Sequence, residues 1–159
     1  MFRIGSIFLF SLLACPLWSI DPKEALKLLQ EGNARYVQEK LIHPNRSHES
    51  RQSVTMQQNP FGTILGCSDS RVSPEIVFDQ GIGDLFVVRV AGNVVGPVEL
   101  DSIEYSVVHL GSNLVMVMGH ERCGAVQAVL SNNTKDIEAG AQLIQPAVDK
   151  SRTMQGNAE

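Results

Sequence analysis

The chain has 159 residues, a length typical of a single domain, and carries a net charge of −4 from 13 Lys and Arg against 17 Asp and Glu. This acidic balance excludes nucleic-acid binding through a broad basic surface, so no nucleic-acid partner is expected. Because 43% of the residues are hydrophobic and only three are cysteine, a folded core is expected, and both disorder and a disulfide-rich scaffold are excluded.

Residues 1–20 have the pattern of an export signal. Arg3 is the only charged residue before Asp21, and an apolar stretch lies between them. This stretch is interrupted by Pro16 and is shorter than the about 20 apolar residues that a membrane-spanning helix needs. We therefore expect a signal peptide over 1–20 and a location in the periplasm or elsewhere outside the cytoplasm. A retained membrane anchor and lipid attachment at Cys15 after cleavage are the alternatives.

The sequence after the signal opens with a helix pattern and then a loop pattern. Asp21 can cap a helix, Pro22 suits its first turn, and apolar residues follow at helical spacing. We therefore expect a helix over about 22–39. Residues 41–59 are polar and aperiodic, and we expect them to form an arm or loop.

Three short apolar runs come next, and they are residues 62–67, 85–90 and 114–118. Runs of this length and composition are typical of strands buried on both faces of a sheet. Helical patterns separate or follow these runs, and they are residues 73–81, 97–111, 122–130 and a fourth helix that Thr134 would cap and Pro146 would kink or end. Alternating strands and helices predict an α/β domain with a parallel-sheet core and flanking helices.

Reactive side chains follow two of the predicted strands. Cys67, Asp69 and Arg71 lie just after the first strand, and His120 and Cys123 lie just after the third. Because the carboxyl ends of parallel strands meet at one edge of a sheet, we expect these side chains to converge there. Two thiolates and one imidazole are a natural ligand set for Zn²⁺, and three protein ligands leave a fourth position open. The sequence therefore predicts a zinc site of Cys67, His120 and Cys123.

The neighbouring residues leave alternatives open. Asp69 could be a fourth ligand that closes the site. It could instead accept a hydrogen bond from solvent on the metal while Arg71 holds its carboxylate in a bidentate pair. In an oxidising compartment Cys67 and Cys123 could also form a disulfide, but this would leave the nearby His120 and Asp69 unexplained.

Four segments occur in a fixed order, and they are Cys67-Ser68-Asp69-Ser70-Arg71, Gly83 to Arg89, Ala91-Gly92-Asn93 and Gly119-His120 to Cys123-Gly124. Together they resemble the β-class carbonic anhydrases, and the resemblance extends from about Pro60 to Leu130. It implies that Cys67, His120 and Cys123 bind zinc and that Asp69 and Arg71 form a catalytic dyad. It also implies that Gln80 lines the CO₂ pocket, often facing a partner subunit. The implied reaction is the reversible hydration of CO₂ to bicarbonate and a proton.

The resemblance also bears on the extent of the domain and on its partners. It implies a homo-dimer or a higher homo-oligomer. Members of the family continue into further strands at the sheet edge, whereas only three strands are evident here. We therefore expect the domain over 21–159 to be incomplete at its C-terminus, with edge strands and part of the dimer surface missing. Two other functions stay open, a hydrolase of a CO₂-like sulfur compound and a non-catalytic zinc-binding surface protein.

Overall fold

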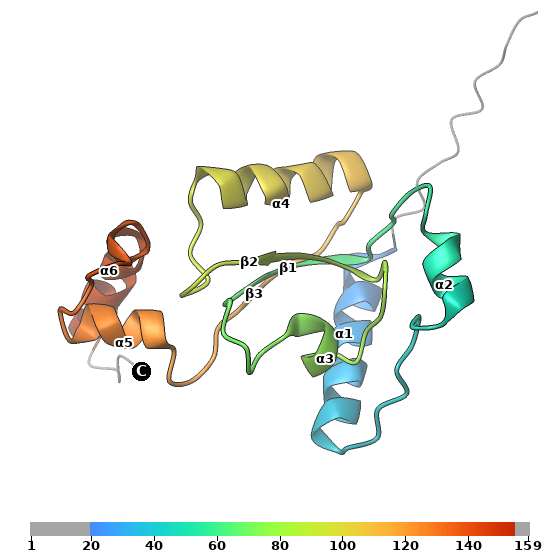
Figure 1. The fold of residues 1–159 in the computed structure, drawn as a ribbon, viewed down its shortest axis with the longest axis horizontal. Helices are drawn as coiled ribbons and strands as arrows, with labels where there is room; N and C mark the ends of the chain where they lie inside the picture. Colours follow the sequence, from blue (N-terminus) through green and yellow to red (C-terminus); the bar gives the residue numbers. More distant parts are fainter. Residues whose placement is uncertain (1–19, 155–159) are drawn as a thin grey trace, which may run out of the picture.

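The computed structural model, which describes residues 20–154, contains a three-stranded parallel sheet (Figure 1). Strand β1 (Gly62–Gly66) lies in the centre, with β2 (Leu85–Arg89) on one side and β3 (Val115–Met118) on the other. Each strand begins and ends within one residue of its predicted position. The prediction of an α/β fold with a parallel sheet is therefore confirmed.

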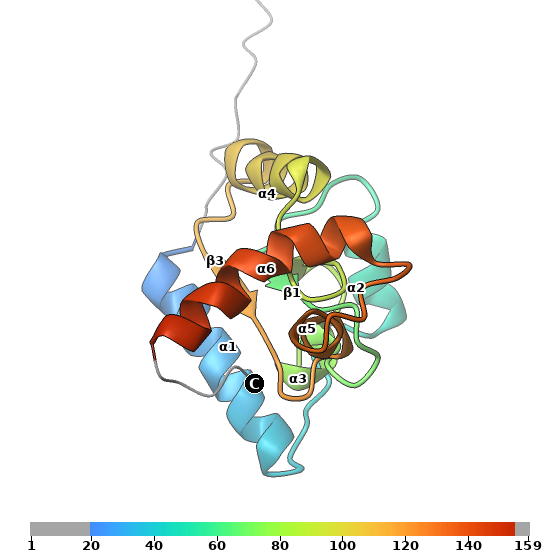
Figure 2. The same cartoon turned by 90° about the vertical axis from the view of Figure 1, so that its left-hand side faces the viewer.

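Helices lie on both faces of the sheet and beyond the carboxyl ends of its strands. Helix α4 (Pro97–Leu110) lies on one face, and α1 (Pro22–Val37) and the short α3 (Pro74–Val77) lie on the opposite face (Figure 1). Helices α5 (Gly124–Leu130) and α6 (Glu138–Thr153) pack together beyond the carboxyl ends of the strands (Figure 2). Helices α5 and α6 therefore lie at the end of the sheet where the strands lead into their turns.

The first helix forms as its sequence predicts. The Asp21 carboxylate accepts a hydrogen bond from the Lys23 N–H (2.8 Å), and Pro22 occupies the first turn. Ala25 and Leu29 are fully buried, and Leu29 packs with Ile64 of β1 in the core. Apolar periodicity and the cap therefore agree, and the helix ends two residues before the predicted end.

The expected loop over 41–59 contains a helix, α2 (His48–Ser53), so this prediction was wrong in that part. Ser47 caps the helix by accepting a hydrogen bond from the Ser50 N–H (3.1 Å), and Glu49 lies in its first turn. The helix buries no residue. Because it packs no apolar face into the core, its sequence lacks the apolar periodicity from which the other helices were predicted.

Two helices are shorter than predicted, α3 at its C-terminus and α5 at its N-terminus. Helix α3 ends four residues before Gly81 because Asp79 adopts a left-handed backbone conformation (φ 46°). Helix α5 begins two residues later than predicted because Arg122 is also left-handed (φ 54°). Helix α4 ends as predicted at a left-handed Gly111 (φ 70°).

The fourth predicted helix was wrong at its start, and Pro146 does not end it. Thr134 lies in a turn in which its carbonyl accepts a hydrogen bond from the Ile137 N–H (3.1 Å), and α6 begins only at Glu138. The helix continues past Pro146 to Thr153. An interior proline costs about 3 kcal/mol. Burial of Ile144 and Val148 against α5, worth roughly 1.5–3 kcal/mol for each side chain, offsets that cost.

Only the central strand is buried on both faces, so this expectation was wrong for the other two. Strand β2 is half-buried, while in β3 Val115 and Val117 are exposed and Met116 packs in the core beneath α1. The physical reason is the position of α4, which packs on β1 and β2 and leaves the same face of β3 uncovered in the described part of the chain.

A buried hydroxyl cluster fastens α4 to the central strand. The Thr63 hydroxyl lies 2.7 Å from the Ser106 hydroxyl and donates to the Ser112 hydroxyl at 2.8 Å. All three side chains are at most 1% exposed. Because buried hydroxyls are costly when unpaired, the cluster fixes how α4 sits on β1.

A buried carboxylate ties α1 to the loop after α3. Asp79 is fully buried and accepts hydrogen bonds from Arg35 Nε (2.6 Å) and from the Ile42 and His43 N–H groups (3.1 Å each). Burial alone would raise the pKa of Asp79, but these donors hold it below its ordinary value. Asp79 therefore remains ionised and fixes the chain between α1 and α2. The sequence reasoning missed this residue.

The predicted signal peptide and Cys15 lie outside the described residues. Within residues 20–154, none of the helices combines the length and the apolar character that crossing a membrane requires.

Candidate metal centre

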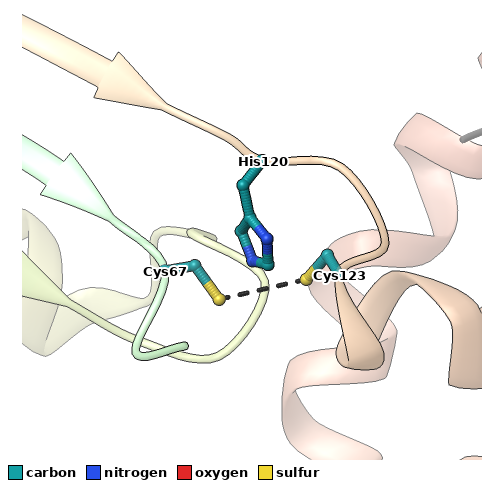
Figure 3. Close-up of side chains that lie close together, drawn as sticks. All are labelled: Cys67, His120 and Cys123. Atoms are coloured by element: carbon teal, nitrogen blue, oxygen red, sulfur yellow. Dashed lines mark hydrogen bonds between the residues drawn. The ribbon is translucent and has the colours of Figure 1, made fainter. Parts of the chain in front are cut away.

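Three side chains from two strand ends converge on one point (Figure 3). Cys67 follows β1, and His120 and Cys123 lie in the turn between β3 and α5. Their candidate ligand atoms all lie within 4.8 Å of one another, and both thiols are buried. The structure thus brings together the three residues that the sequence predicted as metal ligands.

The spacing of the two sulfur atoms fits a shared ion better than a disulfide. The Sγ atoms of Cys67 and Cys123 lie 3.9 Å apart, and both cysteines are free. A disulfide would need about 2.05 Å. Two Zn–S bonds of about 2.3 Å at a tetrahedral angle would place the sulfur atoms about 3.8 Å apart. The sulfur positions therefore match a tetrahedral zinc site within about 0.1 Å.

His120 presents a buried nitrogen to the same point. Its Nδ1 lies 2.9 Å from the Glu121 carbonyl oxygen, a contact in which a protonated Nδ1 donates. Its Nε2 is buried, and among the described residues it has no hydrogen-bond partner. A buried polar atom without a partner costs about 1–3 kcal/mol. A metal ion bound at the Nε2 lone pair would remove this cost, so the residues present fit a zinc ion.

The surroundings of Cys67 favour its thiolate. Burial raises the pKa of the thiol, but N–H donors from Gly92 (3.3 Å from Sγ) and Asp69, together with His120 and Cys123, outweigh burial and lower that pKa below its ordinary value. The thiolate is the form that binds a metal. Gly92 was noted in the sequence only as part of a motif, and its N–H contact with sulfur was missed.

Asp69 is held by Arg71 rather than placed among the ligands. Arg71 Nε donates to Asp69 Oδ1 (2.8 Å), and Nη2 donates to Oδ2 (2.7 Å). These bonds hold the pKa of the Asp69 carboxyl well below its ordinary value. Oδ2 lies 3.8 Å from His120 Nε2, at the border of the ligand cluster. Arg71 therefore holds the Asp69 carboxylate in this structure, and a fourth-ligand role for Asp69 in a closed site stays a prediction.

Gln80 lies in the loop between α3 and β2 and is not among the three residues of this cluster. Its side-chain Nε2 donates to the Phe78 carbonyl (2.8 Å), and its backbone carbonyl accepts from Arg46 Nη2 (3.1 Å). It lines a separate cavity with Arg46 and Ile76. The suggested contact of Gln80 with substrate stays a prediction.

Known protein families and relatives match the part of the chain that contains these residues. A family described as "Carbonic anhydrase" matches residues 62–159. A carbonic anhydrase of Mycolicibacterium smegmatis is 50% identical over 111 residues, which are 70% of this chain and 54% of the relative. The chain therefore spans about half the length of this curated relative.

Solved structures agree with the fold. The β-carbonic anhydrase CafA of Aspergillus fumigatus has a TM-score of 0.61 and 29% identity, with 83% of this chain and 62% of that chain covered. A tetrameric β-carbonic anhydrase of Sordaria macrospora has a TM-score of 0.53 and 25% identity, with 82% and 66% covered. The matched residues include all three candidate ligands and the Asp69–Arg71 pair. The chain belongs to the β-class carbonic anhydrase family.

Proposed function

We propose that the protein binds Zn²⁺ through Cys67, His120 and Cys123 and catalyses the reversible hydration of CO₂ to bicarbonate and a proton. The observation that carries this proposal is the unpartnered, buried His120 Nε2, which faces two thiols at zinc-like spacing. Family membership supports the reaction. A zinc ion at such a site supplies Lewis acidity toward water and substrate oxygen.

In this proposal Asp69 orients the reacting water. The paired Arg71 keeps the carboxylate ionised, so Asp69 accepts a hydrogen bond and does not donate one. Arg71 also holds the carboxylate in one direction, since two parallel N–H donors leave little freedom to rotate. An ionised Asp69 beside the ligand cluster therefore accepts a hydrogen bond from the reacting water. This hydrogen bond orients the water so that one of its oxygen lone pairs faces CO₂.

Arg71 has a second contact that joins the two ligand-bearing turns. Its Nη2 also donates to the Arg122 carbonyl (3.2 Å), one residue before Cys123. The same guanidinium thus links the turn after β1 with the turn before α5. Arg71 therefore acts on Asp69 directly and on the position of Cys123 through the backbone.

We propose a homo-oligomer as the working form and export as its route. Exposed apolar side chains on α4 and β3, among them Val98, Val108 and Val117, support an interface between copies of the chain. The solved relative from Sordaria macrospora is described as tetrameric. The residue pattern over 1–20 supports export. Light scattering tests the assembly, and the N-terminal sequence of the protein recovered from an extracytoplasmic fraction tests the export.

The reaction is tested on the full chain by zinc content and by stopped-flow CO₂ hydration. We expect one zinc ion per chain, and activity that Asp69→Asn lowers at least tenfold while zinc content is retained. A folded protein without zinc would reject the proposal. Zinc without CO₂ hydration would favour a non-catalytic zinc protein, and hydrolysis of CS₂ or COS in place of CO₂ hydration would favour the sulfur-compound hydrolase.

A further inference from the structure

Arg89 reaches from β2 to the backbone of the turn that carries Cys67. It is the last residue of β2 and pairs in register with Gly66, the last residue of β1. Its Nε donates to the Cys67 carbonyl (2.9 Å), and its Nη2 donates to the Asp69 carbonyl (2.6 Å). One half-buried guanidinium therefore bridges two carbonyl groups that lie two residues apart.

Arg89 adds donors to this turn at the point where the strand pairing ends. The last parallel ladder contacts are Val90 N–H to the Gly66 carbonyl (3.1 Å) and Ser68 N–H to the Val90 carbonyl (3.2 Å). Beyond them the chain leaves the sheet, and its carbonyl groups require other donors. Arg89 Nε supplies a donor to the Cys67 carbonyl, and at the Asp69 carbonyl Arg89 Nη2 adds a second donor beside the Val72 N–H (3.2 Å).

The two carbonyl groups held by Arg89 belong to the residues that carry the chemistry. Cys67 supplies a thiol to the ligand cluster, and Asp69 supplies the carboxylate beside it. Fixing both carbonyl groups fixes the backbone between them, and with it the directions of both side chains. Arg71 holds the Asp69 side chain, whereas Arg89 holds the backbone to which that side chain is attached.

We infer that Arg89 is a positioning residue of the metal centre, which holds the Cys67–Asp69 turn so that the thiol and the carboxylate face the ion together. The inference rests on the proposed zinc site. It requires an arginine in particular, because a lysine ammonium has one nitrogen and cannot hold two carbonyl groups in the planar, forked manner of a guanidinium.

The test compares Arg89→Met and Arg89→Lys with the wild-type full chain. Zinc affinity is measured by competition with a chromophoric chelator, and geometry by the absorption bands of bound Co²⁺. Residues that orient metal ligands typically contribute 10–100-fold to affinity, so we expect about that loss for Arg89→Met and a smaller loss for Arg89→Lys. The Co²⁺ bands should shift in both variants.

Arg46→Met is the matched control. Arg46 also donates from a guanidinium to a backbone carbonyl, but that carbonyl belongs to Gln80, which is not one of the candidate ligands. We expect its zinc affinity to stay within twofold of wild type, with unchanged Co²⁺ bands.

Three results would overturn the inference. One is wild-type zinc affinity and Co²⁺ spectrum in both Arg89 variants. Another is failure of both variants to fold. The third is a loss of thermal stability that is equal in the metal-free and the zinc-loaded variants. Each of these last two results would assign Arg89 a general structural role. Wild-type protein that binds no zinc would instead reject the proposed function, and this control separates the two failures.

Discussion

Replacing Asp79 by asparagine tests whether the buried carboxylate stabilises the fold. The carboxylate is fully buried and accepts three hydrogen bonds, one from the Arg35 guanidinium and two from backbone N–H groups. Asparagine keeps the shape but brings an amide group that cannot accept all three, and it leaves the Arg35 charge without its partner. The substitution therefore removes charge-assisted bonds without opening a cavity.

The magnitude follows from what each partner can recover. A hydrogen bond to a charged group contributes about 1.5–3 kcal/mol, so three would give roughly 4–9 kcal/mol if none were replaced. The Arg35 side chain is 26% exposed and can regain water, which reduces its share. Breaking a buried ion pair typically costs about 3–5 kcal/mol, and we expect Asp79→Asn to lower the free energy of unfolding by that amount.

Urea unfolding of the metal-free chain, followed by circular dichroism, measures this loss. Arg35→Met is the companion variant, because it leaves the buried carboxylate with its two backbone donors only. The double variant Arg35→Met/Asp79→Asn should lose less than the sum of the two single losses, since the same ion pair is absent in each. A loss below 1 kcal/mol for Asp79→Asn, or strict additivity, would refute the reasoning.

Three further predictions concern acid, packing and the thiols. The pKa of Asp79 is lower in the folded chain than its ordinary value near 4. The ionised carboxylate therefore stabilises the fold above about pH 4, and this stabilisation is lost as the pH falls through the folded pKa. The difference in unfolding free energy between wild type and Asp79→Asn should shrink between pH 6 and pH 3. Thr63→Val removes one hydrogen-bond partner from each of the Ser106 and Ser112 hydroxyls and should lower the free energy of unfolding in urea by about 1–3 kcal/mol. Thr55→Val, in the exposed turn after α2, should change that free energy by less than about 0.5 kcal/mol. Mass spectrometry after alkylation without reductant should find Cys67 and Cys123 both modified in denatured, chelator-treated protein, and protection of both would indicate a disulfide instead.

The sheet and the ligand set were predictable because each depends on local sequence. Short apolar runs bounded by glycine and polar residues predict strands, and parallel strands place their carboxyl ends together. Cys67, His120 and Cys123 follow such ends directly, so convergence required only the correct fold class. The bounds of α3 and α5 were less predictable, since left-handed Asp79 and Arg122 set them.

The supporting contacts were not predictable, because they join side chains to backbone atoms far away in the sequence. Arg89 contacts carbonyl groups 20 and 22 residues before it, and Gly92 donates to a sulfur atom 25 residues before it. Residue type says that arginine can donate, but not which carbonyl groups will face it. For Arg89 the available signal was a charge at the end of an otherwise apolar strand, which calls for a specific partner.

The strand order explains why so few strands suffice to assemble this centre. Because β1 is central, the turn that carries Cys67 has a neighbour on each side. Strand β3 leads into the turn that supplies His120 and Cys123, while β2 leads to Arg89 and Gly92, which contact the Cys67 turn from the other side. Ligands thus come from one neighbour and backbone support from the other. A change confined to β2 should therefore weaken metal binding without removing a ligand, which is the behaviour expected of the Arg89 variants.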